Sequence, residues 1–276
     1  MTTGKARDAT QLLSKVPQVT LVFWLVKICA TTVGETGGDA LSMSLHLGYL
    51  VSTLIFLGFF VVALTAQLTV KRYHVWIYWL VVVATTTVGT TTSDFLDRTA
   101  GLGYAKSTAA ELAAVIGMLI LWRVSTGRIA VDHIVDRRNE TFYWVTILVS
   151  NTLGTALGDF TSDTLPDLMV KLTHAPDGAW DAWGFELGAV LFAALIGVVA
   201  LLHLMKALPE AILFWAAYVL TRPLGATLGD TLTKPLAQGG LNLDRFAATG
   251  TIALAMVAIL AVGHWRRRSA VGEAPA

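Results

Sequence analysis

Gly154-Thr155-Ala156-Leu157-Gly158-Asp159 is one of four copies of a short pattern, Gly-x-x-x-small-Asp, that decides how this chain folds. The other copies are Gly34-Glu35-Thr36-Gly37-Gly38-Asp39, Gly89-Thr90-Thr91-Thr92-Ser93-Asp94 and Gly225-Ala226-Thr227-Leu228-Gly229-Asp230. Each copy ends an apolar run that begins at an aromatic pair. The second aromatic residue stands ten residues before the first glycine in every copy, at Trp24, Trp79, Trp144 and Trp215. This shared register predicts a fourfold internal repeat.

The composition predicts a membrane protein. The 276 residues are 55% hydrophobic and only 14% charged, too apolar for an ordinary soluble domain. Apolar stretches of roughly 18–25 residues suffice to cross about 30 Å of hydrocarbon. They fall near 20–41, 45–68, 75–96, 107–124, 141–163, 183–205, 211–233 and 246–265. We therefore expect an all-α integral membrane protein in which eight transmembrane helices form four tandem two-helix repeats, at about 17–70, 73–124, 139–205 and 209–268, within a single domain of residues 1–276.

The distribution of lysine and arginine predicts the orientation. The termini and the loops on their side hold thirteen of these residues, and the opposite loops hold five. The positive-inside rule then places both termini in the cytoplasm, in a bacterial inner membrane with the lipid bilayer as partner. We expect no cleaved signal peptide and no nucleic-acid partner, because the charge asymmetry is topological and the net charge is only +1. The aromatic pairs are typical of an interfacial belt.

The second half of each motif-bearing span is polar and acidic. Steps of four residues place Lys27, Glu35 and Asp39 on one helix face. Such a face is costly in lipid, so we expect it to line a shared interior. Nine acidic residues on the spans or at their ends, against the two bases Lys27 and Arg222, predict an electronegative interior. Oxygen ligands favour a hard divalent cation. The candidate metal ligands are Asp39, Asp94, Asp159, Asp230, Glu35, Asp163 and Asn151.

A second group of residues is predicted to couple transport to protons. Glu111 and Glu186 occupy equivalent positions in their repeats, and His46 occupies the same position in the first. Lys27 and Arg222 would replace the cation as counter-ions once it leaves. The complete group is Glu111, Glu186, His46, Lys27, Arg222 and Asp97.

The motif glycines allow two interpretations. They could permit helix breaks that free backbone carbonyls for a ligand, as in transporters with discontinuous helices. They could instead let helices pack closely. Pro223, just before Gly225, favours a break in the seventh span. The predicted break positions are Gly34, Gly89, Gly154, Gly225 and Pro223.

With its four repeats ending in Gly-Asp or Ser-Asp, the whole chain resembles the bacterial multi-pass proteins described as uncharacterised membrane-anchored proteins, a resemblance that implies no activity. The segment Glu35-Thr36-Gly37-Gly38-Asp39 is also distantly similar to the Glu-x-Gly-Asp motifs of manganese and calcium exporters. It has an extra glycine and no basic residue after the aspartate, and the other three copies lack the glutamate. That likeness therefore concerns the style of the site alone.

These observations favour an inner-membrane transporter of a hard divalent cation, with manganese as the first choice, acting as an exporter in exchange for protons. The metal is the substrate, and no organic cofactor is expected. One alternative is a cation channel whose filter is a ring of the four motif aspartates. Another is a transporter of a small organic anion or amino acid held by Lys27 and Arg222. No catalytic motif is present, so we expect no enzyme activity. The sequence does not fix the oligomeric state.

Overall fold

The computed structural model describes residues 15–129, 134 and 136–270, with side chains to residue 265. This part of the chain is all-helical and contains eight long helices. They are α2 (Leu21–Asp39), α3 (Gly48–Thr69), α4 (Val75–Asp94), α5 (Tyr104–Thr126), α6 (Arg137–Thr173), α7 (Gly184–Leu204), α8 (Glu210–Thr233) and α9 (Arg245–Ala270). Short π-helical segments follow α2 and α4, at η1 (Ala40–Ser44) and η2 (Phe95–Thr99). Two 3₁₀ turns, η3 (Asp181–Trp183) and η4 (Leu236–Gln238), complete the elements.

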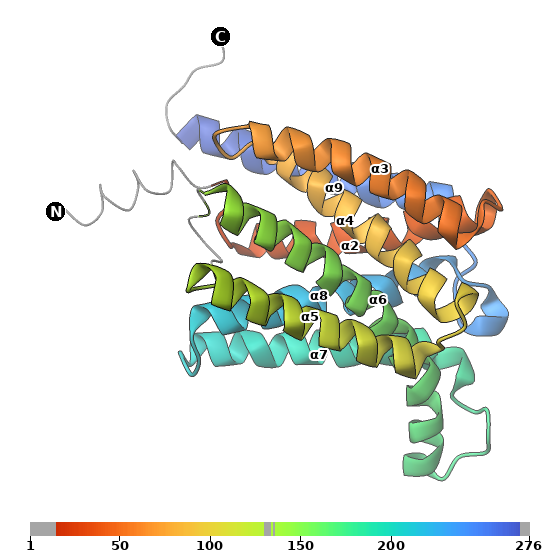
Figure 1. The fold of residues 1–276 in the computed structure, drawn as a ribbon. Helices are drawn as coiled ribbons and strands as arrows, with labels where there is room; N and C mark the ends of the chain where they lie inside the picture. Colours follow the sequence, from red (N-terminus) through yellow and green to blue (C-terminus); the bar gives the residue numbers. More distant parts are fainter. Residues whose placement is uncertain (1–14, 130–133, 135, 271–276) are drawn as a thin grey trace.

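The motif-bearing helices form an inner ring. Helix α2 contacts α4 and α8, and α6 contacts the same two helices from the opposite side (Figure 1). Each remaining helix packs outside the ring on the inner helix of the following repeat: α3 on α4, α5 on α6 and α7 on α8. Helix α9 closes the circle by packing on α2. The four repeats are therefore arranged cyclically, as the sequence pattern predicted.

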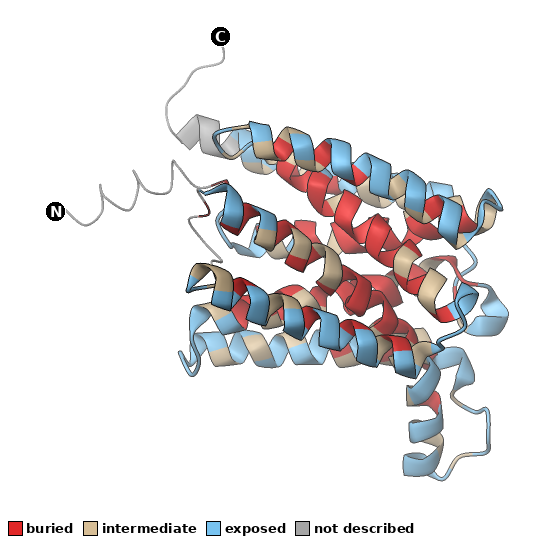
Figure 2. Cartoon of the chain, viewed as in Figure 1, coloured by how far each residue is buried: buried red, intermediate tan, exposed pale blue. Residues whose placement is uncertain are grey.

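Inner and outer helices differ in what they bury. In its most apolar window, 67% of α4 lies inside the structure, against 11% of the segment that contains α7. Figure 2 shows the same contrast, with buried residues concentrated in the inner helices. Within the part of the chain that the structure describes, six helical segments are long and apolar enough to cross a membrane. The two long helices not among them are α2 and α6. Helices α2 and α6 carry many polar or charged residues on buried faces. The six apolar segments are what a membrane protein requires.

The motif glycines allow neighbouring inner helices to approach closely. A Cβ atom at Gly34 of α2 would overlap Thr86 of α4, and one at Gly225 of α8 would overlap Thr31 of α2. Gly89 meets Asn151 and Gly154 meets Arg222 in the same way. In each pair, the partner stands three residues before the motif glycine of its own repeat. One contact is thus repeated around the ring, and only glycine leaves room for it.

The predicted helix breaks are therefore wrong for these residues. Helices α2, α4, α6 and α8 continue through Gly34, Gly89, Gly154 and Gly225, and Pro223 lies inside α8. The irregularity comes later, where π-helical turns begin directly after Asp39 and Asp94. Close packing explains the glycines, and the wider turns change the helix only beyond the aspartates.

The aromatic pairs close the ring at the end opposite the aspartates. Phe23, Tyr78, Trp79 and Trp144 are buried and pack edge-on or tilted against one another. The Tyr78 and Tyr143 hydroxyls lie 2.8 Å apart in a hydrogen bond. The predicted interfacial belt is therefore wrong for most of these rings, which form a buried cluster between the inner helices.

Helix α6 is longer than the expected 141–163 span. Asp136 caps its start by accepting a hydrogen bond of 2.8 Å from the backbone N–H of Asn139. Burial alone would raise the pKa of the Asp136 carboxyl, but the hydrogen bonds from Asn139 and from neighbouring backbone N–H groups together hold the pKa below its usual value. Pro166 lies inside the helix, and the end of α6 projects from the bundle (Figure 1). A proline removes one helical hydrogen bond and accounts for such a change of direction.

A buried ion pair joins the start of α6 to the segment before α2. Lys15 Nζ lies 2.7 Å from Glu140 Oε2, and Gln67 donates to Glu140 Oε1 at 3.3 Å.

We expect Glu140→Gln to destabilise the protein by about 3 kcal/mol, because it leaves the buried ammonium without its counter-ion. The exposed Glu210→Gln should change stability by less than about 0.5 kcal/mol. Chemical unfolding in detergent measures both, and equal losses would contradict the role of the pair.

Candidate functional site

The four motif aspartates are buried and form two bridged pairs. Lys234 Nζ lies 2.8 Å from Asp39 Oδ2 and 3.1 Å from Asp230 Oδ1. On the other side of the ring, Arg98 lies 3.0 Å from Asp159 Oδ2 and 3.4 Å from Asp94 Oδ1. Asp39 has a further basic neighbour, Arg245, whose Nε is 3.8 Å away. Each pair of carboxylates is therefore held together by one shared cation.

The two bridging bases reduce the fourfold symmetry to twofold. Arg98 and Lys234 each stand four residues after the motif aspartate, in the second and fourth repeats. The same position holds Met43 in the first repeat and Asp163 in the third. Sequence reasoning missed both bases because it counted them as loop residues. Their spacing after the aspartate was the available signal, since residues four apart lie on one helix face.

The side chains that face the interior one turn before the aspartates form a second polar layer. Arg222 Nη2 lies 3.0 Å from Glu35 Oε2 and donates to Thr155 Oγ1 at 2.6 Å. It also hydrogen-bonds to Thr90 Oγ1, which in turn donates to Glu35 Oε2 at 3.3 Å. Arg222 is completely buried beside Glu35, and its counter-ion role in transport stays a prediction.

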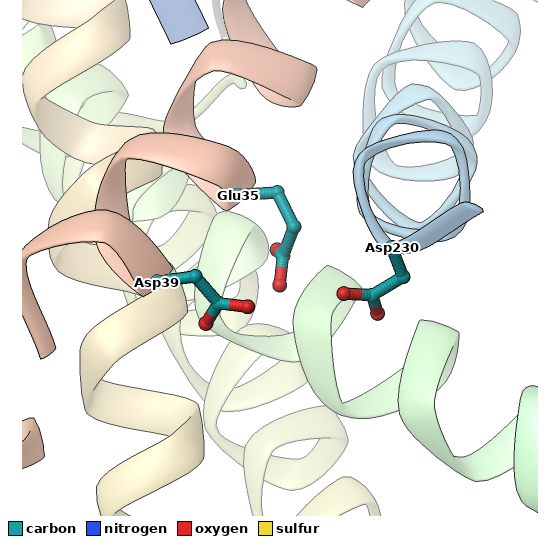
Figure 3. A group of neighbouring side chains, drawn as sticks. All are labelled: Glu35, Asp39 and Asp230. Atoms are coloured by element: carbon teal, nitrogen blue, oxygen red, sulfur yellow. The ribbon is translucent and has the colours of Figure 1, made fainter. Parts of the chain in front are cut away.

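Three carboxylates of these two layers converge. Oxygen atoms of Glu35, Asp39 and Asp230 all lie within 4.8 Å of one another, and all three residues are buried. Figure 3 shows the carboxyl groups of Glu35 and Asp39 on α2 turned toward that of Asp230 on α8. Asp39 Oδ1 is buried without a hydrogen-bond partner. Asp230 Oδ1 also lacks a hydrogen bond, but it lies 3.1 Å from Lys234 Nζ. The geometry gives a three-carboxylate group between two inner helices, with Asp39 Oδ1 as a free acceptor.

Lys27 does not neutralise these carboxylates. Its Nζ forms no ion pair with a carboxylate among the described residues, but it donates to Asn151 Oδ1 at 3.3 Å and lies 4.2 Å from the centre of the Tyr218 ring. Asn151 also donates to Thr85 Oγ1 at 3.0 Å. Both predicted roles change accordingly: Asn151 is a partner of Lys27 instead of a member of the carboxylate group, and Lys27 has no carboxylate to neutralise.

Several predicted site residues lie outside this group. Asp163 and His46 are exposed, and Glu186 is only partly buried on the outer helix α7. Asp94 and Asp159 belong to the Arg98 pair. The expected count of two interior bases was too low, since Arg98, Lys234 and Arg245, which lie just beyond the predicted spans, also approach the aspartates.

Asp97 of η2 and Glu111 of the outer helix α5 lie apart from this group. Both are buried, and Ser107 donates a hydrogen bond to Asp97 Oδ1. The two carboxylate oxygens of Glu111 have no hydrogen-bond partner. These residues lie beside the ring and do not belong to the three-carboxylate group, so the structure leaves their predicted coupling role as a prediction.

The comparisons with known proteins agree with the repeat organisation. The model of a family described as Repeat of Unknown Function (DUF347) matches four segments, residues 22–73, 77–128, 142–207 and 213–269. This supports the expected likeness to a multi-pass repeat family and carries no link to manganese or calcium exporters. No curated protein and no solved structure matches the chain.

Proposed function

We propose that this chain, which belongs to the family of the Repeat of Unknown Function (DUF347), is a membrane carrier for a hard divalent cation. The observation that carries the proposal is the buried group of Glu35, Asp39 and Asp230. Manganese is the first ion to test, because Mn²⁺ accepts carboxylate and water ligands.

The outer surface supports a position in the bilayer. Helices α3, α7 and α9 expose most of their apolar windows, and a surface this apolar would aggregate in water. Lysine and arginine are in excess in the loops at the end of the bundle that holds the aromatic cluster. This excess favours a cytoplasmic position for that end. The carboxylate group then lies nearer the external side, the side from which an exported ion leaves.

The spacing of the carboxylates suits an ion between them. Two oxygens that each lie about 2.4 Å from a cation are at most about 5 Å apart, and the three side chains meet this limit at 4.8 Å. A divalent ion there would replace the ammonium of Lys234, which now bridges Asp39 and Asp230. Arg222 would continue to hold Glu35 or yield it to the ion. Lys234 thus serves as a tethered competitor that keeps the site neutral when the substrate has left.

The charge pattern favours a carrier over a channel. A filter of four equivalent aspartates would present four free carboxylates to a central pore. Here each aspartate is paired with a neighbour through Lys234 or Arg98, and the two halves of the ring use different bases. Ion entry must therefore break specific ion pairs, and such breaking is a natural trigger for a change of access.

Isothermal titration tests the proposal directly. The purified protein in nanodiscs is titrated with Mn²⁺, Mg²⁺, Ca²⁺ and Zn²⁺, in two buffers that differ in ionisation enthalpy. We expect Mn²⁺ to bind, with protons released if export is driven by proton exchange. Binding without proton release would reject the proton coupling alone. Absence of binding by all four ions would reject the cation carrier.

The competitor role of Lys234 gives a further prediction. Lys234→Met should raise the apparent affinity for Mn²⁺ by about tenfold, because the ion no longer displaces a bound ammonium. Arg98→Gln is the matched control, since it removes a bridging base of the other aspartate pair. The same titration, performed at pH 8, measures both variants. A weaker affinity in Lys234→Met with an unchanged control would contradict the exchange.

A further inference from the structure

The interior also contains positive charge that the carboxylate group does not neutralise. Lys27 is completely buried, and the ion pairs of the described residues include none to it. Arg222 uses only Nη2 in its contacts with Glu35, Thr90 and Thr155. Its Nε and Nη1 atoms are buried without a hydrogen-bond partner. Among the described residues, Glu35 therefore pairs with Arg222, and no carboxylate pairs with Lys27.

The two basic side chains lie close together, against consecutive turns of α6. Lys27 reaches Asn151 at 3.3 Å, and Arg222 reaches Thr155, one turn further along, at 2.6 Å. The stem of Arg222 packs on Gly154, which lies between these residues. The two basic side chains therefore face the same stretch of α6. They approach from α2 and α8, the helices that also supply the three carboxylates.

Such an arrangement calls for a negative partner. An unpaired buried charge is expensive, and buried donors without acceptors are rare in folded proteins. We propose that a small monovalent anion, a halide or the carboxylate group of a small molecule, binds between Lys27 and Arg222. A role for this anion during cation transport rests on the proposed function. Its binding between Lys27 and Arg222 does not. The anion accepts from Arg222 Nε and Nη1, while Lys27 Nζ contributes charge from the other side.

Thermal unfolding tests the anion site. The purified protein in nanodiscs, with EDTA present, is heated in sodium bromide, sodium acetate or the sodium salt of HEPES, a bulky sulfonate, at equal ionic strength. We expect saturating bromide to raise Tm by about 5 °C relative to the HEPES salt, because it binds only the folded protein. An equal shift in acetate assigns the site to carboxylate groups as well, whereas a shift in bromide alone assigns it to halides. Identical Tm values in all three salts would overturn the proposal.

Substitution of Lys27 locates the site. Lys27→Met should abolish the bromide shift, and Lys71→Met, at an exposed loop lysine, should keep it. A bromide shift that persists in a folded Lys27→Met protein would overturn this location. If that variant does not fold, equilibrium dialysis of the wild type with radiolabelled bromide decides, since stoichiometric binding is expected and its absence overturns the proposal. Titration with Mn²⁺ in the HEPES salt is scored separately, so failure of the cation carrier remains distinguishable from failure of the anion site.

Discussion

Asp39→Asn is expected to weaken Mn²⁺ binding by roughly 100-fold or more, because even the loss of an outer-shell partner of a metal ligand costs 10–100-fold. The substitution keeps the size of the side chain and removes its charge. Asp39 also has the free oxygen, Oδ1, of the three-carboxylate group. Isothermal titration of the purified variant measures the loss, and circular dichroism checks that the helices remain.

Two control variants make this prediction specific. Asp163→Asn alters an exposed aspartate of α6, four residues after the motif Asp159, and should leave the affinity unchanged. Asp159→Asn alters a motif aspartate that pairs with Arg98 and lies outside the three-carboxylate group. It should therefore weaken binding less than Asp39→Asn does. Equal losses at Asp39 and Asp159 would instead favour a ring in which the four aspartates act together, as the channel alternative requires.

The architecture was predictable because it depends on local pattern. Eight apolar runs, four motif copies and a constant offset to the tryptophans led to four helix pairs with the motif helices inside. The structure adds how the pairs connect. Each outer helix packs on the inner helix of the next repeat, as α3 does on α4. Nothing in a single helix encodes this choice, since an apolar outer helix fits either neighbour.

The site was predictable only in part. Motif spacing placed Asp39 and Asp230 at one level, and their burial follows from the ring. The bridging role of Lys234 was missed because the residue follows an apolar run and was counted with the loops. Its long side chain reaches back to aspartates on two helices. Likewise Lys27 was assigned to the carboxylates on charge alone, whereas its direction on α2 brings it to Asn151 and Tyr218.

The glycines were open to two interpretations because small residues serve both helix breaks and close contacts. What decides between them is the neighbouring helix. Thr86 lies against Gly34, and Thr31 lies against Gly225, each from a different repeat. A contact across repeats becomes visible only when the ring is assembled. The two interpretations also differ in what an added methyl group should do.

Gly34→Ala and Gly225→Ala are each expected to destabilise the protein by about 3 kcal/mol, at the upper end of the usual cost of overpacking. The added Cβ would overlap side-chain and backbone atoms of Thr86 or Thr31, so the inner helices must separate. Separation of α8 from α2 also moves Asp230 away from Glu35 and Asp39. Gly225→Ala should therefore weaken Mn²⁺ binding as well. Chemical unfolding in detergent and isothermal titration measure the two effects.

The matched controls are glycines of outer helices that meet no neighbouring atom. Gly58→Ala in α3 and Gly197→Ala in α7 add the same methyl group in open space, so they should keep or slightly raise stability, because alanine favours a helix over glycine by about 1 kcal/mol. If Gly34→Ala and Gly225→Ala behaved like these controls in stability but lost transport, the glycines would serve as hinges. A selective loss of stability at the inner positions means that the ring, and with it the convergence of the three carboxylates, depends on the missing side chains.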